Sequence, residues 1–177
     1  ESLRHAMTKF SNLHFTANPD TKKRLIKMGE FKKNIFTVGC PSIDALYQEK
    51  SLKDNLILKK FNINKKNLFL LVLQHPVTSE VNLAKKQMIQ TIQAIKMSKI
   101  QHLIVFPNSD AGSKDILKII KKSKMNFTST LNLSEYRSLL DGNMILVGNS
   151  SSGIHEAASF KVPVINNSHY DLPLYST

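Results

Sequence analysis

Short runs of apolar residues recur along the chain at intervals that suit buried β-strands. Each run is five or six residues long and is rich in Ile, Leu, Val and Phe. Such runs are typical of strands that are covered on both faces of a parallel sheet. We therefore expect strands at residues 13–17, 35–39, 68–73, 102–107, 144–148 and 162–166.

Helical periodicity lies between these runs. Over residues 79–98 apolar side chains return every three or four positions, which places them on one stripe facing a sheet. Residues 114–122 repeat this pattern, and Ser134 is expected to cap a further helix that ends near Gly142. Strands that alternate with helices predict an α/β fold with Rossmann-like parallel sheets.

A polar segment rich in lysine and asparagine, residues 50–67, separates two such blocks and is expected to be a domain junction. Residues 1–49 then form the C-terminal part of an N-terminal Rossmann-like domain. Residues 68–177 form a C-terminal Rossmann-like domain that is truncated. The chain opens on Glu1 without an initiator Met and stops soon after a strand, so we expect a piece of a larger protein.

Composition narrows the function classes. The chain has 177 residues, 41% of them hydrophobic, and a formal charge of +12. The lysines are spread over helix-like segments and only 7% of residues are aromatic, so we expect solvated helix faces and no nucleic-acid partner. A bilayer span needs roughly 20 apolar residues, and no such run occurs, so we expect a cytoplasmic protein without a membrane partner. The single Cys40 excludes an internal disulfide and a cysteine-rich zinc site.

The stretch VGNSSSGIHEAASF, residues 147–160, places small residues between a strand and an expected helix that begins near Ile154. Unpaired N–H groups at a helix start attract anions, small residues let a phosphate approach, and serine hydroxyls add donors. Glu156 is placed to accept hydrogen bonds from a vicinal diol such as ribose. A nucleoside diphosphate satisfies both demands. An N-cap serine beside a glutamate that merely favours the helix dipole explains the stretch equally well.

Two further strand ends carry polar groups. His75 closes the run LVLQH, and Pro76 stops a simple continuation before Thr78 or Ser79 opens the next helix. Asn108 and Asp110 follow the run HLIVFP. Ligands of parallel sheets bind at the carboxyl ends of strands, where a histidine can bind phosphate or transfer protons. A structural role for His75 is the alternative.

The segments QHPVTSE, FPNSDAGS and GNSSSGIHEA, in this order and spacing, resemble the C-terminal domain of UDP-N-acetylglucosamine 2-epimerases. The opening ESLRHAMTKFSNLHFTAN is similar to part of that family's N-terminal domain, so the resemblance covers almost the whole chain. The forms HPVTSE and NSSSG look like the hydrolysing branch. The resemblance implies two Rossmann-like domains in a GT-B-type architecture, present here only in part.

The resemblance also implies roles. Ser150 and Ser151 would hold the diphosphate, Glu156 would bind the ribose, and Gly153 would be a further UDP-binding residue. His75 and Asn108 would line the phosphate side of the cleft, and His75 would also be a catalytic residue. The backbone near Leu131 would border the uracil, and Glu1 would assist proton transfer at the sugar. The implied reaction removes the C2 proton, expels UDP and adds water to the resulting glycal, without cofactor or metal. A homodimer is implied as well.

One family feature is missing. The family places an arginine after the strand that matches VPVINN, where this chain has Tyr170, with His169 as a possible substitute. The resemblance places the family's arginine-bearing first loop and its remaining catalytic acids upstream of Glu1, and its last helices beyond Thr177. The fragment alone is therefore expected to be inactive. Two alternatives stay open: a GT-B glycosyltransferase, which would yield a glycoside, and a non-catalytic protein that binds a UDP-sugar and leaves it intact.

Overall fold

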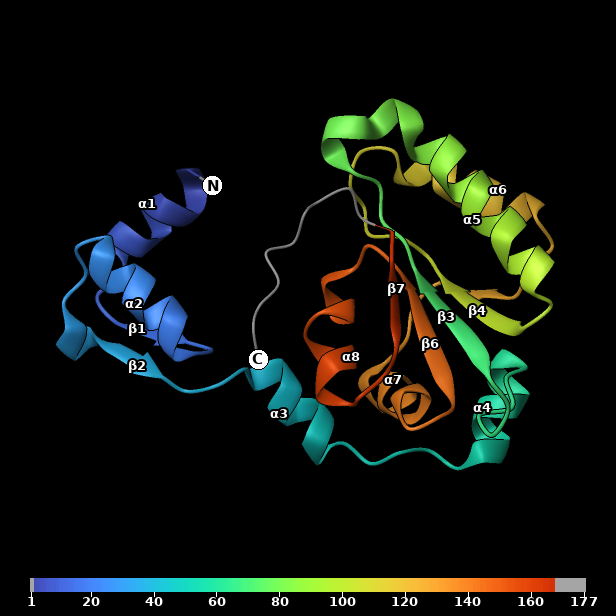
Figure 1. The fold of residues 1–177 in the computed structure, drawn as a ribbon, viewed down its shortest axis with the longest axis horizontal. Coiled ribbons are helices and arrows are strands. Elements are labelled where there is room, and N and C mark those ends of the chain that lie inside the picture. Colours follow the sequence, from blue (N-terminus) through green and yellow to red (C-terminus); the bar gives the residue numbers. More distant parts are fainter. Residues whose placement is uncertain (1, 168–177) are drawn as a thin grey trace. The chain divides into compact units, whose positions relative to one another are not determined.

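The computed structural model describes residues 2–167 of the chain. The chain divides into two compact units, residues 1–45 and residues 46–177. Figure 1 shows the elements of each unit. The division falls inside helix α3, Pro41–Gln48, and not within the polar segment 50–67. The assignment of domains from the sequence stays a prediction for the larger protein.

The first unit holds two short parallel strands, paired from His14↔Ile35 to Thr16↔Thr37. Both strands lie inside the apolar runs expected at 13–17 and 35–39. Asn18 caps the helix that follows the first strand, because its side chain accepts from the Thr21 N–H. The elements are α1 Ser2–Phe10, β1 His14–Thr16, α2 Pro19–Lys27, η1 Lys32–Asn34 and β2 Ile35–Thr37.

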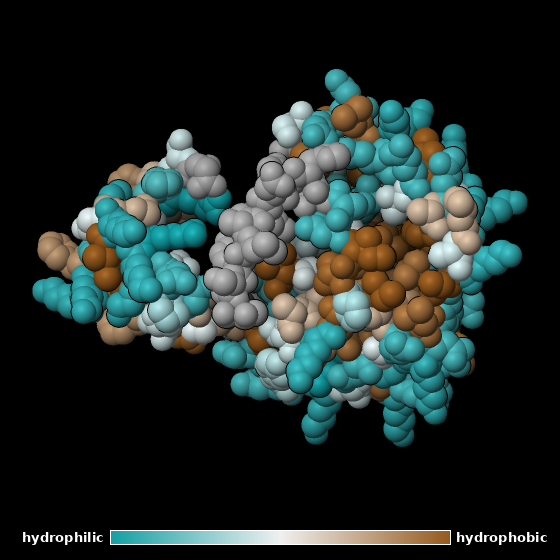
Figure 2. Space-filling view, in the orientation of Figure 1, coloured by the Kyte–Doolittle hydropathy of each residue, from teal (hydrophilic) through white to brown (hydrophobic). Residues whose placement is uncertain are grey.

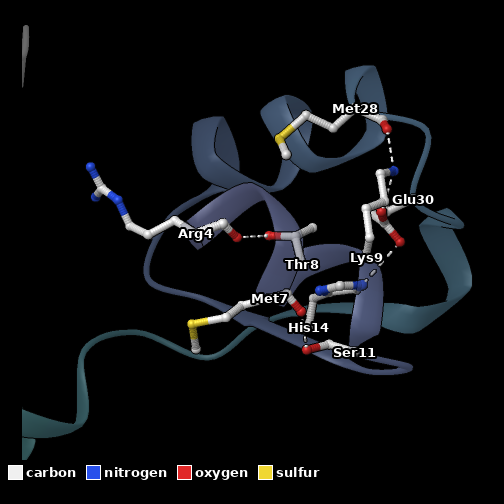
Figure 3. A network of polar contacts seen from close by, with 8 residues as sticks. All are labelled: Arg4, Met7, Thr8, Lys9, Ser11, His14, Met28 and Glu30. Carbon is white, nitrogen blue, oxygen red and sulfur yellow. Dashed lines mark hydrogen bonds and ion pairs between the residues drawn. The ribbon is translucent and has the colours of Figure 1, made fainter. Parts of the chain in front are cut away.

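A polar network ties the helices of this unit to β1 (Figure 3). Lys9 Nζ lies 2.6 Å from a carboxylate oxygen of Glu30 and also donates to the Met28 carbonyl. His14 Nε2 is 3.2 Å from the other Glu30 oxygen. The hydrogen bond and charge of Lys9, followed by those of His14, hold the pKa of Glu30 below its ordinary value. The Glu30 carboxylate thus joins α1 to β1, two elements that bury little apolar surface.

The second unit is built on a five-stranded parallel sheet of order β5-β4-β3-β6-β7. The apolar runs expected as strands at 68–73, 144–148 and 162–166 each contain one, and the run at 102–107 overlaps β4, which begins one residue earlier. The short strand at 127–128 was not predicted. Two residues in a polar segment are too few to show the hydrophobic periodicity of a strand. The strands are β3 Phe69–Leu73, β4 Gln101–Val105, β5 Phe127–Thr128, β6 Met144–Gly148 and β7 Val164–Asn166.

Helices cover both faces of this sheet, as the buried central strand requires. Side chains of β3 alternate between two core clusters: Leu71 packs with residues of α4, α7 and α8, and Val72 packs with residues of α5 and α6. Tyr47 stacks on Phe160, with ring centroids 4.9 Å apart, and its hydroxyl donates to the Ser159 carbonyl. The helices are α4 Asp54–Phe61, α5 Ala84–Ser98, α6 Ser113–Lys122, α7 Leu133–Leu140 and α8 Glu156–Ser159.

Three expectations about helices need correction. The helix expected over 79–98 is two elements, a 3-10 segment η2, Thr78–Leu83, and α5, because Glu80 has non-helical dihedrals (φ −128°, ψ 32°). Asn132, not Ser134, caps α7. Its side chain accepts from the Glu135 N–H, and the Glu135 side chain accepts from the Asn132 N–H, which completes a capping box. The segment 50–67, expected as a polar junction, contains the helix α4, which buries Ile57 and Phe61 in the core.

One face of the sheet is partly open. A groove of about 520 Å³ runs between α5 and the strands β3, β6 and β7, with Leu70, Ile145, Val147 and Ile165 in its lining. Figure 2 shows apolar side chains gathered over the sheet of this unit. Within residues 2–167, no helix has the length and apolar character needed to cross a bilayer.

Candidate active site

Three strand ends of the larger unit meet at one edge of the sheet. The backbone N–H of His75, just beyond β3, donates to Asn149 Oδ1 at 2.7 Å, and Asn149 lies just beyond β6. Asn149 Nδ2 donates back to the His75 carbonyl at 2.9 Å. The backbone N–H of Asn108, beyond β4, donates to His75 Nδ1 at 3.2 Å. The predicted meeting of His75 and Asn108 at neighbouring strand ends is therefore confirmed, as the parallel topology dictates.

His75 is half-buried and lies between a backbone donor and a nearby carboxylate. Burial lowers the pKa of its imidazole below the ordinary value, and the negative charge of Asp110 opposes that shift. Asp110 is itself held by the Asn108 side chain, whose Nδ2 lies 2.6 Å from Asp110 Oδ2. The result is a mostly neutral histidine at the mouth of the strand-end crevice near pH 7.

The serine stretch departs from the expected long helix. Ser151–Gly153 form a 3-10 turn, η3, and α8 is only four residues long. Ser150 caps the turn by accepting from the Ser152 N–H, as the alternative interpretation of the stretch predicted. Because the chain turns tightly here, four consecutive N–H groups already donate within the turn: those of Ser152, Gly153, Ile154 and His155. Any anion would therefore rely on the hydroxyls of half-buried Ser150 and exposed Ser151.

The small residues around the turn also have packing reasons. Gly148, the last residue of β6, has φ +144°, and a Cβ there would collide with the carbonyl group of Leu73 on the paired strand. A Cβ on Gly153 would lie 3.0 Å from a methyl carbon of Val164 in β7. Gly148 thus lets the ends of β3 and β6, which carry His75 and Asn149, approach each other, and Gly153 lets the turn lie close to β7.

Glu156 faces a buried neighbour on α7. Its Oε2 and the hydroxyl of Tyr136 are both buried, and neither forms a hydrogen bond to any residue in the described part of the chain. Burial raises the pKa of Tyr136 to about 12, the neighbouring Ser152 hydroxyl opposes the shift, and the charge of Glu156 adds to it. An unpaired buried oxygen costs roughly 1–3 kcal/mol of stability, and the Ser152 hydroxyl is the nearby group that offsets this cost at Tyr136.

The remaining expected residues are placed as follows. Asn108 is exposed at the strand-end crevice, and Leu131 is half-buried against the core cluster that contains α7. Glu1, His169 and Tyr170 lie outside the described residues.

Sequence reasoning missed two residues, Asn149 and Tyr136. Asn149 could have been found, because it directly follows a strand and precedes the serine stretch. Tyr136 carries no such signal, since only the packing of α7 brings it to Ser152 and Glu156.

Comparison with known proteins decides the family. The sequence model described as UDP-N-acetylglucosamine 2-epimerase matches residues 1–169. The chain belongs to the UDP-N-acetylglucosamine 2-epimerase family. The chain is 35% identical over 170 residues to a UDP-N,N'-diacetylbacillosamine 2-epimerase (hydrolyzing) of Legionella pneumophila. It is 30% identical over 169 residues to a UDP-N-acetylglucosamine 2-epimerase of Neisseria meningitidis. Each alignment covers 94% of this chain and 45% of the relative, so the chain spans less than half the length of these epimerases.

Solved structures of the epimerase family have the same fold. The UDP-GlcNAc 2-epimerase from Neisseria meningitidis bound to UDP-GlcNAc has a TM-score of 0.69 at 16% identity, over 92% of this chain and 46% of that one. The enzyme from Methanocaldococcus jannaschii in complex with UDP-GlcNAc and UDP has a TM-score of 0.67 at 21% identity, over 88% and 45%. The expected α/β fold with parallel sheets, as part of a GT-B-type architecture, is confirmed.

Proposed function

We propose that this chain carries the UDP-binding part of a hydrolysing UDP-N-acetylglucosamine 2-epimerase. The enzyme would convert UDP-GlcNAc or a related UDP-amino sugar into a free N-acetylmannosamine-type sugar and UDP. The observation that carries the proposal is the meeting of His75, Asn108 and Asn149 at one sheet edge in a chain of this family. Relatives named as hydrolysing enzymes, from Legionella pneumophila and Campylobacter jejuni, favour the hydrolysing outcome.

In the proposed reaction a base removes the C2 proton of the sugar while the bond from C1 to the phosphate oxygen breaks. The electron pair of the former C2–H bond forms the glycal double bond, and UDP leaves with the negative charge. Water then adds across that double bond, its hydroxyl to C1 and a proton to C2. Free sugar with the opposite C2 configuration results. Preorganised donors lower the barrier because they meet the charge that builds on the departing oxygen.

The donors at the diphosphate would be the Ser150 and Ser151 hydroxyls, with Gly153 keeping the turn close and His75 and Asn108 on the opposite side. Ser151 is exposed and Ser150 is half-buried with its oxygen already accepting from the Ser152 N–H, so both hydroxyl protons remain available. Loss of one such donor is expected to lower turnover on the order of a hundredfold.

Glu156 would accept hydrogen bonds from the ribose hydroxyls. Its Oε2 is buried without a hydrogen-bond partner among residues 2–167, which is the state expected of an acceptor that awaits ligand hydroxyls. Leu131, which precedes α7, would border the uracil. Glu1 would assist proton transfer at the sugar, and His169 or Tyr170 would stand where the family has an arginine. A homodimer, a cytoplasmic location and a role in sialic-acid-type amino sugar synthesis complete the proposal.

The test uses the full-length protein in a coupled assay of UDP release from UDP-GlcNAc and UDP-N,N'-diacetylbacillosamine. Free amino sugar and UDP in equal amounts are expected, and both His75→Ala and Glu156→Ala should lose activity. Retained activity in both variants would remove these residues from the site. A glycoside product with an added acceptor alcohol would indicate a glycosyltransferase, and tight UDP binding without turnover a binding protein.

A further inference from the structure

Asn149 pairs both backbone groups of His75 with its side-chain amide. Strand pairing between β3 and β6 ends at Leu73↔Gly148, and Asn149 is the next residue. Its side-chain amide has the same carbonyl and N–H groups as a peptide bond. The amide oxygen accepts from the His75 N–H at 2.7 Å, and the amide N–H donates to the His75 carbonyl at 2.9 Å. The backbone of His75 is therefore fixed beyond the end of the sheet, where a loop would otherwise be free to move.

The imidazole ring is fixed by a second, independent contact. The backbone N–H of Asn108 donates to His75 Nδ1 at 3.2 Å. A backbone N–H can only donate, so Nδ1 must be the unprotonated nitrogen of the ring. In a neutral imidazole the proton then sits on Nε2. Among residues 2–167, no hydrogen bond reaches Nε2, so this N–H is left for a ligand.

We infer that Asn108 and Asn149 hold His75 as the Nε2–H tautomer, so that His75 meets the diphosphate as a neutral hydrogen-bond donor and not as a general base. The inference rests on the proposed function for its ligand, but the tautomer itself does not. Neutral imidazole does not give up its remaining proton near pH 7, and its only lone pair faces the Asn108 N–H. His75 thus stabilises the departing phosphate oxygen by a hydrogen bond, and another group removes the C2 proton.

Asn149 is in this scheme a positioning residue, because its side-chain amide bonds to the backbone of His75 and, among residues 2–167, forms no hydrogen bond with the imidazole. Burial of the imidazole works in the same direction, since it lowers the pKa of His75 and keeps the ring neutral. Protonation at Nδ1 would break the Asn108 contact and place two donors face to face.

The direct test is nitrogen NMR on the full-length protein labelled only in its histidines, with His75→Gln used to assign the His75 signals. At pH 7.5 we expect one nitrogen with the shift of an unprotonated ring nitrogen, coupled as Nδ1, and a protonated Nε2. A dominant Nδ1–H tautomer, fast averaging of both tautomers, or a charged ring at this pH would overturn the inference. UDP is then added. A change at Nε2 with Nδ1 unaltered supports a donor to the phosphate, and no change at Nε2 contradicts it.

Kinetic variants separate a donor from a base. Gln can donate a hydrogen bond but cannot accept a proton, so His75→Gln should bind UDP within about threefold of the original affinity and keep measurable turnover. His75→Leu, of similar volume, should bind UDP about tenfold more weakly and turn over about a hundredfold more slowly. His75 would instead be identified as a base if both variants lost turnover equally and if the rise of turnover with pH near neutrality disappeared in His75→Gln.

Asn149→Asp tests the positioning role, because it keeps the acceptor for the His75 N–H and removes the donor to the carbonyl. We expect unchanged circular dichroism, several-fold weaker UDP binding and partial averaging of the His75 tautomers. Full affinity with an undisturbed His75 ring would overturn the role of Asn149. If the unmodified protein binds no UDP by calorimetry while the Nε2–H tautomer is present, the proposed function fails and the tautomer assignment stands.

Discussion

At the scale of single residues, Gly148 sets how closely two strand ends can approach. Its φ of +144° is open to glycine alone, and a Cβ would collide with the carbonyl group of Leu73. We predict that Gly148→Ala lowers the free energy of unfolding by about 3 kcal/mol, measured by urea denaturation. Gly39→Ala is the matched control, since Gly39 also has a positive φ (+84°) but nothing within 4 Å of the added methyl. An equal loss in both variants would show that dihedral strain alone is responsible.

The buried phenol of Tyr136 predicts a loss of stability in alkali. Its pKa is raised to about 12, whereas an unfolded tyrosine titrates near 10. Between those values the unfolded chain releases the proton first, so the contribution is complete below pH 10 and is lost as the pH rises through 12. The loss is about 2 to 3 kcal/mol.

This change is measured as the difference between the original protein and Tyr136→Phe in denaturation curves from pH 9 to pH 11. The original protein should lose stability more steeply. Tyr47→Phe, which removes an exposed phenol bonded to the Ser159 carbonyl, is the control. The same flattening in both variants would contradict a special role for Tyr136.

At the scale of elements, the start of α7 depends on Asn132. Its side chain accepts from the Glu135 N–H at 2.9 Å, and the buried Glu135 carboxylate accepts from the Asn132 N–H. The same carboxylate forms an ion pair with Lys60. We predict that Asn132→Ala destabilises the larger unit by about 1 kcal/mol, seen as a lower midpoint in urea. Asn55→Ala, on an exposed face of α4, should leave the midpoint unchanged. A harmless Asn132→Ala would mean that Lys60 alone holds Glu135.

Elements also show what the sequence could and could not predict. Runs such as FLLVL gave β3 because burial on both faces demands continuous apolar residues. Strand-end topology likewise predicted that His75 and Asn108 lie close together. The 3-10 turn at the serine stretch was missed, since small polar residues carry no periodicity that separates a 3-10 turn from the start of an α-helix. The pairing of Asn149 with His75 joins residues 74 positions apart, which no local pattern reveals.

At the scale of the whole molecule, the two units differ in how much apolar surface they bury. The larger unit has two clusters of buried side chains on opposite faces of its sheet. In the smaller unit Ile35 is a fully buried apolar side chain, while Leu3, Phe10 and Phe15 are largely exposed. Each Å² of buried apolar surface stabilises a fold by roughly 25 cal/mol. The hydrophobic contribution to folding is therefore much smaller in the smaller unit.

This difference predicts a graded pattern of amide hydrogen exchange in the 177-residue chain. Amides of β3 should exchange slowest, because nearly all of its side chains are buried and it pairs on both edges. Amides of β7 should exchange faster, since its side chains are exposed and it lies at the sheet edge. Those of α1 and β1 should exchange fastest, because opening there exposes little apolar surface. Exchange followed by mass spectrometry over minutes to hours resolves the three classes. Equal protection of β1 and β3 would contradict the ranking and would mean that the smaller unit is stabilised by contacts outside its own core.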